Sequence, residues 1–114
     1  MSEASLHALV AEFGGTAPDP RRFRMTITVT GAAPWAEHGW SGRQVTIGGE
    51  MVLHVLAPVP RCVVTTRNPE SGVTDARTLH ALARLRGKND ITFGVWCEII
   101  QPGRVQLGDL VIPS

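Results

Sequence analysis

A cysteine that directly follows an arginine is the clearest candidate for chemistry in this 114-residue chain. Cys62 stands after Arg61 in the stretch RCVVTT, at the head of a short run of β-branched residues. A thiolate is a soft ligand that suits thiophilic metals, and a neighbouring cation favours its formation. A small buried side chain in a strand is the alternative interpretation, because free cysteines are among the most buried residues. Cys97, in FGVWCEII, has no adjacent cation and is interpreted as a packing residue.

Arginines and threonines supply the other candidate ligand contacts. Arg21, Arg22 and Arg24 gather before an alternating apolar segment. A guanidinium binds phosphate through paired hydrogen bonds, which makes these side chains candidates for anion binding. A solvated basic patch is the alternative, since charged residues mostly lie at surfaces. Thr65 and Thr66 either bond to a cofactor or are ordinary strand residues.

A loop with two tryptophans contains a further candidate pair, Glu37 and His38. The two side chains could serve as acid and base at a pocket rim, but loop polar residues are usually solvated. Trp35, Trp40 and Trp96 either line a cleft or fill a core. No H-x-x-x-H or C-x-x-C spacing indicates zinc, and the glycine-rich segments lack the context of a dinucleotide loop.

Composition limits the classes of partner. Eleven Lys and Arg residues against ten Asp and Glu give a formal charge of +1, which does not favour nucleic acid. The apolar stretch MVLHVLAPVP is too short to span a membrane, for which about 20 residues are needed. The opening residues lack the basic region of a secretory signal, and two cysteines are too few for a disulfide framework. We therefore expect one cytoplasmic domain over residues 1–114, large enough to bury a core.

Two helices are expected from apolar spacing. Residues 6–13 place four apolar side chains on one helical face, and Gly14 and Gly15 follow as a stop. Residues 75–86 carry leucines every three positions, and Gly87 ends this second helix.

Strands account for the remaining predicted elements. Residues 25–30 alternate between apolar residues and threonine, which predicts a half-buried strand. The sequence QVTIGGEMVLHVL predicts a strand, a Gly-Gly turn and a second strand. Residues 62–66 predict another short strand, and residues 91–100 and 104–112 predict a closing hairpin. The fold class indicated is mainly β: a small, curled, mostly antiparallel sheet or barrel with one or two short helices.

Several ordered motifs resemble one family. The sequence RCVVTTRNPESGVTD, followed by LHALARLRG and FGVWCEIIQPGRVQLGDLV, is similar to the core signature of the MOSC domain, a β-barrel shared with the mitochondrial amidoxime-reducing component. The match runs from about residue 5 to residue 111. RFRMT stands where the family usually has R-F-R-P-N, and FGVW stands for F-G-V-Y.

The resemblance implies a molybdenum cofactor, molybdopterin, and a role for each matching residue. Cys62 is implied as the catalytic metal ligand, completing a sulfur-rich shell around molybdenum. Arg24 is implied as a contact of the anionic pterin, and Arg61, beside the metal ligand, as a further cofactor-binding residue. Thr26 takes the place of the family's asparagine, whose amide can both donate and accept hydrogen bonds. Thr65 and Thr66 are the remaining cofactor-binding candidates.

Two functions stay open on this resemblance. The first is an oxidoreductase that removes oxygen from N-hydroxylated small molecules with electrons from separate redox proteins. The second is a non-catalytic or degenerate barrel that binds or relays cofactor or sulfur, or acts as an interaction module. The family is also associated with pyridoxal phosphate binding. Because members normally have further strands at the start, we expect an N-terminally truncated barrel whose open edge is covered in a homodimer or by a heteromeric partner.

Overall fold

The computed structural model describes residues 1–13 and 19–114 of the chain. Gly14 and Gly15, which were expected to end the first helix, lie outside the described residues. The two α-helices are α1 (Glu3–Glu12) and α2 (Thr78–Arg86). The strands are β1 (Gln44–Ile47), β2 (Met51–Pro60), β3 (Thr92–Gln101) and β4 (Val111–Pro113). Three short 3-10 helices are η1 (Pro20–Phe23), η2 (Ala36–Trp40) and η3 (Val63–Thr66).

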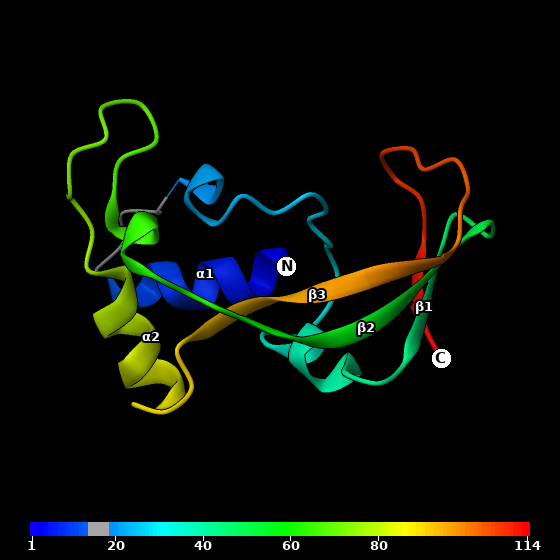
Figure 1. Cartoon of the computed structure of the whole chain (residues 1–114), viewed down its shortest axis with the longest axis horizontal. Helices are drawn as coiled ribbons and strands as arrows, with labels where there is room; N and C mark the ends of the chain where they lie inside the picture. Colours follow the sequence, from blue (N-terminus) through cyan, green and yellow to red (C-terminus); the bar gives the residue numbers. More distant parts are fainter. Residues whose placement is uncertain (14–18) are drawn as a thin grey trace.

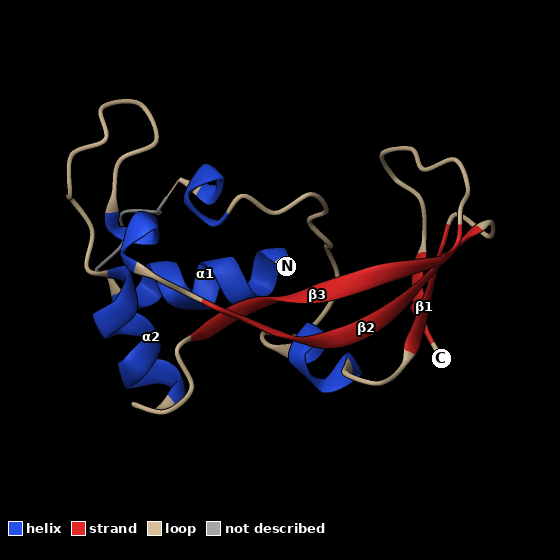
Figure 2. Ribbon diagram, in the orientation of Figure 1, coloured by secondary structure: helices blue, strands red, loops and turns tan. Residues whose placement is uncertain are grey.

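The elements separate into two ends joined by two long strands (Figure 1). We call residues 1–13, 19–24 and 61–93, which hold α1, α2, η1, η3 and the first residues of β3, the helical end. We call residues 44–57 and 95–113, which hold β1, β4 and the adjoining parts of β2 and β3, the sheet end. Figure 2 shows the helices of one end and the strands of the other, with β2 and β3 running between them.

Each end has its own apolar core. At the helical end the buried members include two aromatic rings, Phe23 and Phe93, and two leucines, Leu9 and Leu82, all essentially without solvent contact. At the sheet end only three side chains are fully buried: Val45, Ile47 and Val55. The helical end is therefore the more completely packed of the two.

Both predicted helices are confirmed. Helix α1 begins at Ser2, whose hydroxyl accepts the backbone N–H of Ser5 at 3.1 Å, an ordinary N-cap arrangement. Leu9 lies on its buried face. Helix α2 ends at Gly87, where φ is 101°, a backbone region that favours glycine.

The predicted hairpin around the two adjacent glycines is also confirmed. Strands β1 and β2 pair antiparallel, with Val45 opposite Leu53 and Ile47 opposite Met51. Gly48 and Gly49 both have positive φ, which allows the tight turn between the strands. This hairpin forms the middle of the sheet.

The prediction of a closed barrel is wrong. The sheet has four antiparallel strands in the order β3-β2-β1-β4, so β3 and β4 are its two edges. The predicted closing hairpin of these two strands is therefore wrong as well. Its linker crosses the β1–β2 turn, where the Gln101 side chain donates to the Glu50 carbonyl at 2.7 Å and the Arg104 N–H donates to the Glu50 carboxylate at 3.2 Å. The chain thus reaches β1 from the far side, and the fold is mixed α/β instead of mainly β.

The segment 25–30 shows why the sheet stays open. Its burial alternates as predicted, with Met25, Ile27 and Val29 half-buried and the intervening threonines exposed. Among the described residues, however, its only ladder contact is a parallel bridge between Val29 and Ser2. A barrel closes only when every strand finds a partner on both sides. The segment has the burial pattern of a strand, but in the described residues it forms no ladder with a neighbouring strand. The prediction of a strand here is therefore wrong.

The predicted strand at residues 62–66 is wrong too, because η3 occupies most of it. Pro58 and Pro60 cannot donate ladder hydrogen bonds, and β2 ends at the second of them. The hydroxyl of Thr65 then donates to the Cys62 carbonyl at 3.0 Å, and that of Thr66 to the Val63 carbonyl at 2.5 Å. Such local side-chain bonds offer the backbone an alternative to a sheet.

Candidate functional site

Three of the segments that carry the family resemblance, RFRMT, RCVVTT and FGVW, meet at one guanidinium group. The Nε and Nη2 atoms of Arg61 donate to the Phe93 carbonyl at 2.9 and 2.7 Å, and Nη1 donates to the Phe23 carbonyl at 2.9 Å. Nη2 also donates to the thioether sulfur of Met25 at 2.8 Å. The group lies 5.6 Å from the centroid of the Phe23 ring. Arg61 therefore joins the start of η3, the end of η1 and the start of β3.

The charge of Arg61 is not neutralised by a carboxylate in the described part of the chain. Burial lowers the pKa of this guanidinium from its ordinary value, and an electrostatic contribution from the neighbouring Cys62 opposes that shift. Most of its N–H donors are already engaged, so the structure gives Arg61 a bracing position. Its predicted role as a direct cofactor contact remains a prediction.

Arg24 is the arginine that the surroundings leave available. It follows η1 with φ 51° and ψ 40°, a left-handed conformation that costs a non-glycine residue about 1–2 kcal/mol. Its side chain is exposed, and within residues 1–13 and 19–114 it makes no side-chain hydrogen bond or ion pair. A strained and unpartnered cation is well placed to meet an anion from solution.

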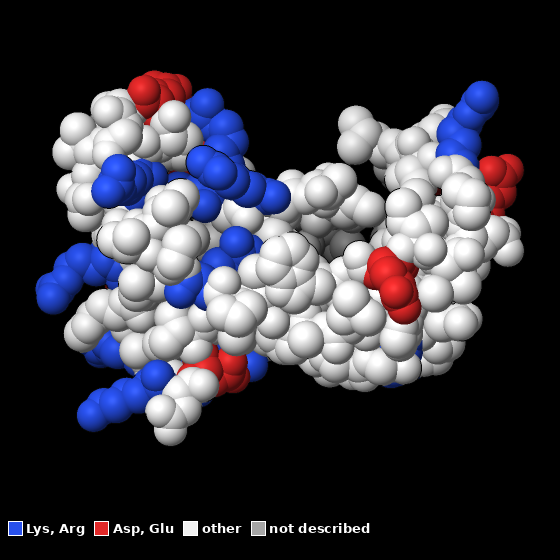
Figure 3. Space-filling view, in the orientation of Figure 1, with Lys and Arg blue, Asp and Glu red and all other residues white. Residues whose placement is uncertain are grey.

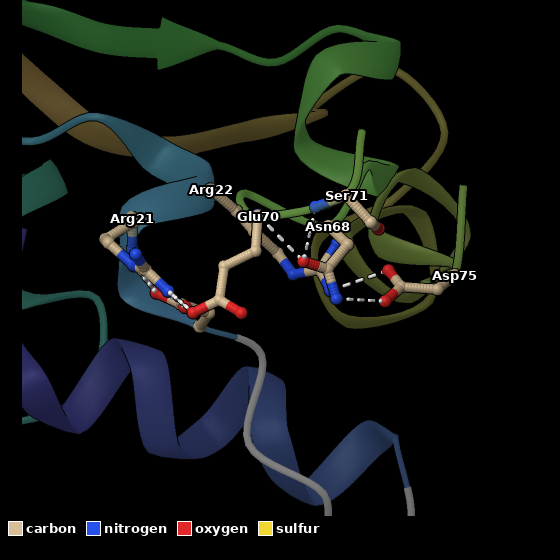
Figure 4. Close-up of polar contacts among 7 residues, drawn as sticks. Arg21, Arg22, Asn68, Glu70, Ser71 and Asp75 are labelled. Atoms are coloured by element: carbon tan, nitrogen blue, oxygen red, sulfur yellow. Dashed lines mark hydrogen bonds and ion pairs between the residues drawn. The ribbon is translucent and has the colours of Figure 1, made fainter. Parts of the chain in front are cut away.

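Arg21 and Arg22 are instead used to hold a loop. Residues 67–77 form a loop at the helical end, and Figure 4 shows the side chains of η1 that contact this loop. Arg21 pairs with Glu70 at 3.1 Å and Arg22 pairs with Asp75 at 2.6 Å. A hydrogen bond from Asn68, ahead of the Arg22 contact, lowers the pKa of Asp75. Of the three arginines in the predicted basic cluster, Arg21 and Arg22 therefore contact the loop, and Arg24 has no described side-chain partner.

Cys62 precedes η3 and is exposed to solvent. Elements η1 and η3 are in contact, and Arg61, the residue before Cys62, bonds to Phe23 and Met25 on either side of Arg24. No group of three or more His, Cys, Asp or Glu side chains that could hold a metal occurs in the described residues.

The predicted threonine contacts divide in the same way. Thr65 and Thr66 are buried, and their hydroxyls are already donating within η3, so they shape the turn that follows the thiol. Thr26 is exposed and lies in the same extended segment as Arg24. The donor set open to a ligand is thus a soft thiol, a free guanidinium and one hydroxyl. This chemistry fits a thiophilic metal carried on an anionic cofactor.

The electrostatic setting is positive. All Lys and Arg residues except Arg43 and Arg104 belong to the helical end or its loops, nine of the eleven. Figure 3 shows these residues gathered over that half of the molecule. An anionic ligand is drawn to such a face, and added salt weakens the attraction.

An apolar cleft of about 560 Å³ lies against the concave face of the sheet. It is lined by side chains from all four strands, among them Val45, Val55, Val95 and Val111. Arg24, Thr26 and Arg61 also contribute to the lining, whereas Cys62, Thr65 and Thr66 do not. The structure therefore brings three of the predicted residues to the cleft and places Cys62 outside it. Cys97 does line the cleft and is exposed, so the prediction that it is a buried packing residue is wrong.

Glu37 and His38 do not form an acid–base pair. Burial alone would raise the pKa of Glu37, but hydrogen bonds from Ser2 and Ser5 outweigh it and lower that pKa. Burial, helped by the charge of Arg86, lowers the pKa of His38, whose ring packs edge-on against Trp35. Both residues serve packing. The tryptophans differ: Trp35 and Trp40 pack on the two cores, and Trp96 is exposed.

Sequence reasoning missed the groups that support the site. The carbonyls of Phe23 and Phe93 and the thioether of Met25 hold Arg61, and Asp75 holds Arg22. Backbone carbonyls have no signature in the sequence. The one available signal was that three motifs, far apart in the chain, occurred together.

Comparison with known proteins places these observations in a family. A family model for the MOSC domain matches residues 1–112. Mitochondrial amidoxime-reducing component 1 of Mus musculus is 31% identical over 122 aligned residues, and that of Xenopus laevis is 32% identical over 121, each covering 97% of this chain and 34% of the relative. Mitochondrial amidoxime reducing component 2 of Bos taurus is 31% identical over 99 residues, 78% of this chain and 29% of the relative. The chain spans about a third of the length of these relatives. No described helix is long and apolar enough to cross a membrane.

Proposed function

The chain belongs to the MOSC domain family, and from that premise we propose that it is a molybdenum-cofactor-binding domain in which the Cys62 thiolate is the protein ligand of the metal. The single observation that carries this proposal is the exposed Cys62 thiol, which directly follows the arginine that bonds to the residues on both sides of Arg24. The family and the cofactor class are associated, and the specific role of each residue here is our proposal.

The chain's own residues would divide the work as follows. Cys62 supplies a soft anionic ligand, and Arg24 supplies a guanidinium for an anionic group of the cofactor. Thr26 lies beside Arg24 on the same exposed segment and adds a hydroxyl donor. Arg61 adds positive charge next to the thiolate, which favours retention of anionic groups.

We propose an N-hydroxylated small molecule as the substrate class, because relatives are named as amidoxime-reducing components. When bound, the cofactor would supply the redox chemistry in which the N–O bond breaks and an N–H bond forms, with two electrons and two protons consumed and one water released. Electrons for this reduction would come from separate redox proteins. The positive face of the helical end suits a partner that carries acidic groups around its electron-transfer site.

Metal and phosphorus content tests the proposal. We expect the chain, purified from a host that makes molybdopterin, to contain molybdenum and organic phosphorus in equal amounts. Cys62→Ser should lose the molybdenum, because a hydroxyl is a harder and less acidic ligand, while Cys97→Ser should keep it. Equal molybdenum in both variants would contradict the assignment and favour the alternative, a non-catalytic barrel that serves as an interaction module.

We further propose that the sheet edges are covered by another chain, either a second copy or a heteromeric partner. The edge strand β3 exposes Trp96, Ile99 and Ile100, an apolar run that is a pairing hazard when bare. Light scattering across micromolar concentrations should report more than a monomer mass for a homodimer. A monomer mass throughout, with no partner recovered, contradicts this proposal.

Two expectations from the sequence are not developed further. Pyridoxal phosphate is left out of the proposal because Lys88, the chain's single lysine, lies beyond α2 and outside the cleft lining. The cytoplasmic location stays a prediction, and the names of the relatives place those proteins in mitochondria.

A further inference from the structure

The contacts of Arg61 surround one residue in particular, Arg24. The Phe23 carbonyl, which accepts from Nη1, belongs to the peptide group that enters Arg24. The Met25 sulfur, which accepts from Nη2, belongs to the residue that follows it. Arg61 itself is joined through one peptide bond to Cys62. The Arg61 side chain therefore connects the residues on both sides of Arg24 to the stretch of backbone that carries Cys62.

We propose that Arg61 is a positioning residue, which sets Arg24 and Cys62 in one fixed relation so that both reach the same bound anionic group. The inference rests on the proposed function, since it assumes that these two residues share a ligand. It assigns to Arg61 a different role from the one expected from the sequence, where Arg61 was a direct cofactor contact.

The occupied donors favour positioning over direct binding. A guanidinium has five N–H donors, and the structure engages four of them with Phe23, Met25 and Phe93. The planar fork of arginine fits two separated carbonyls at once, which a lysine ammonium on a flexible stem cannot do. Arg24, in contrast, has no described side-chain partner and is the guanidinium that an anion can approach.

The backbone at Arg24 explains why a brace is needed. Its left-handed conformation is unfavourable for a residue with a side chain, so neighbouring contacts must hold it. Gly94 leaves the space for that brace: a Cβ on this residue would lie 2.3 Å from the Met25 methyl carbon. The close approach of β3 to Met25 is therefore part of the same arrangement.

Protection of the thiol by phosphate tests the positioning role. The parent chain carries Cys97→Ser, so that only Cys62 reacts with iodoacetamide, and the alkylation rate is measured with and without inorganic phosphate alongside the thermal unfolding midpoint. We expect phosphate to slow the reaction by about threefold or more in the parent, as for an anion held by paired guanidinium bonds. Arg24→Ala should lose the protection because it removes the direct contact.

Arg61→Lys is the decisive variant. It keeps the positive charge and loses the fork, so we expect it to fold and yet to lose phosphate protection as Arg24→Ala does. Arg21→Lys, a matched change on an exposed arginine of the same end, should keep full protection. A folded Arg61→Lys chain that phosphate protects as well as the parent overturns the inference and leaves Arg61 a purely structural residue.

A second variant covers the case in which Arg61→Lys does not fold. Met25→Leu removes only the sulfur acceptor and nearly conserves volume, so the fold should persist and protection should fall partway. Unchanged protection in this variant would then overturn the inference. Absence of protection in the parent itself is a different result: it rejects the shared anion site of the proposed function, and the positioning role with it.

Discussion

The helical end and the sheet end of this molecule are built in opposite ways. The helical end buries two aromatic rings and two leucines almost completely, and Phe23 and Phe93 stack with centroids 4.3 Å apart. The sheet end buries only three aliphatic side chains and borders an open cleft of about 560 Å³. The first is closely packed and positively charged, whereas the second is open and apolar.

The difference assigns the candidate ligand site to the packed end and a surface for contact with another chain to the open end. A candidate ligand site needs fixed geometry, and the thiol, the free arginine and the brace all belong to the packed end or its border. The open end has two unpaired edges and exposed apolar residues, which suit contact with another chain. The following substitutions test that division, in order of decreasing effect.

Phe93→Ala should have the largest effect on stability. Phe93 is fully buried, so its removal should lower the free energy of unfolding by about 3–5 kcal/mol. Ile99→Ala in the same strand is the matched control at the sheet end, because Ile99 is 61% exposed and its truncation should cost little. Urea denaturation of both variants provides the comparison. Equal losses would show that the two ends do not differ in packing.

Gly94→Ala should destabilise the chain more than Gly72→Ala does. Both glycines have φ near 75°, which costs alanine about 1–2 kcal/mol. Only Gly94 faces a close neighbour, Met25, and overpacking there should add about 1–3 kcal/mol. The difference between the two unfolding free energies isolates that contact. If the two variants are equally stable, the Arg61 brace does not depend on this close approach.

Glu37→Gln should cost about 1–3 kcal/mol, because it leaves the donors of Ser2 and Ser5 without a charged acceptor in a buried place. The folded state holds the pKa of Glu37 below its ordinary 4.5. Its contribution is therefore fully present above about pH 4.5 and is lost as the pH falls through the lower folded-state pKa. We expect a shallower loss of stability below pH 4.5 in Glu37→Gln than in the parent. Identical acid unfolding curves would show that this carboxylate does not stabilise the junction of α1 and η2.

Arg21→Ala should have the smallest effect. Its ion pairs with Asp19 and Glu70 join exposed side chains, and such pairs are screened by solvent. We expect no resolvable change in the urea midpoint at physiological salt. A clear decrease in the urea midpoint would show that the contacts between η1 and the loop 67–77 stabilise the helical end.

The sequence predicted local elements better than their pairing. Helix α2 and the β1–β2 hairpin follow from leucine spacing and from two adjacent glycines, which are local signals. Whether residues 25–30 find a strand partner depends on segments far away in the chain, and no local pattern reports it. The 3-10 turn at Thr65 and Thr66 arises because hydroxyls compete with the sheet for backbone carbonyls, an outcome that β-propensity alone does not reveal.

The candidate site shows the same limit. Cys62 and Arg24 are both exposed, and their roles toward a cofactor stay predictions. Residue type alone could not separate Arg24 from Arg21 and Arg22, because the distinction lies in their ion-pair partners. Nor could it show that Arg61 turns toward two backbone carbonyls.

Peptide mass spectrometry after brief alkylation of the purified, molybdenum-containing protein tests the central claim most directly. Cys62 and Cys97 are both exposed in this structure, so both thiols are accessible to a small reagent unless something covers them. If Cys62 ligates the metal, iodoacetamide should modify Cys97 and spare Cys62, and removal of the metal should make Cys62 reactive. Alkylation of Cys62 at the same rate as Cys97, with molybdenum still bound, would contradict the account.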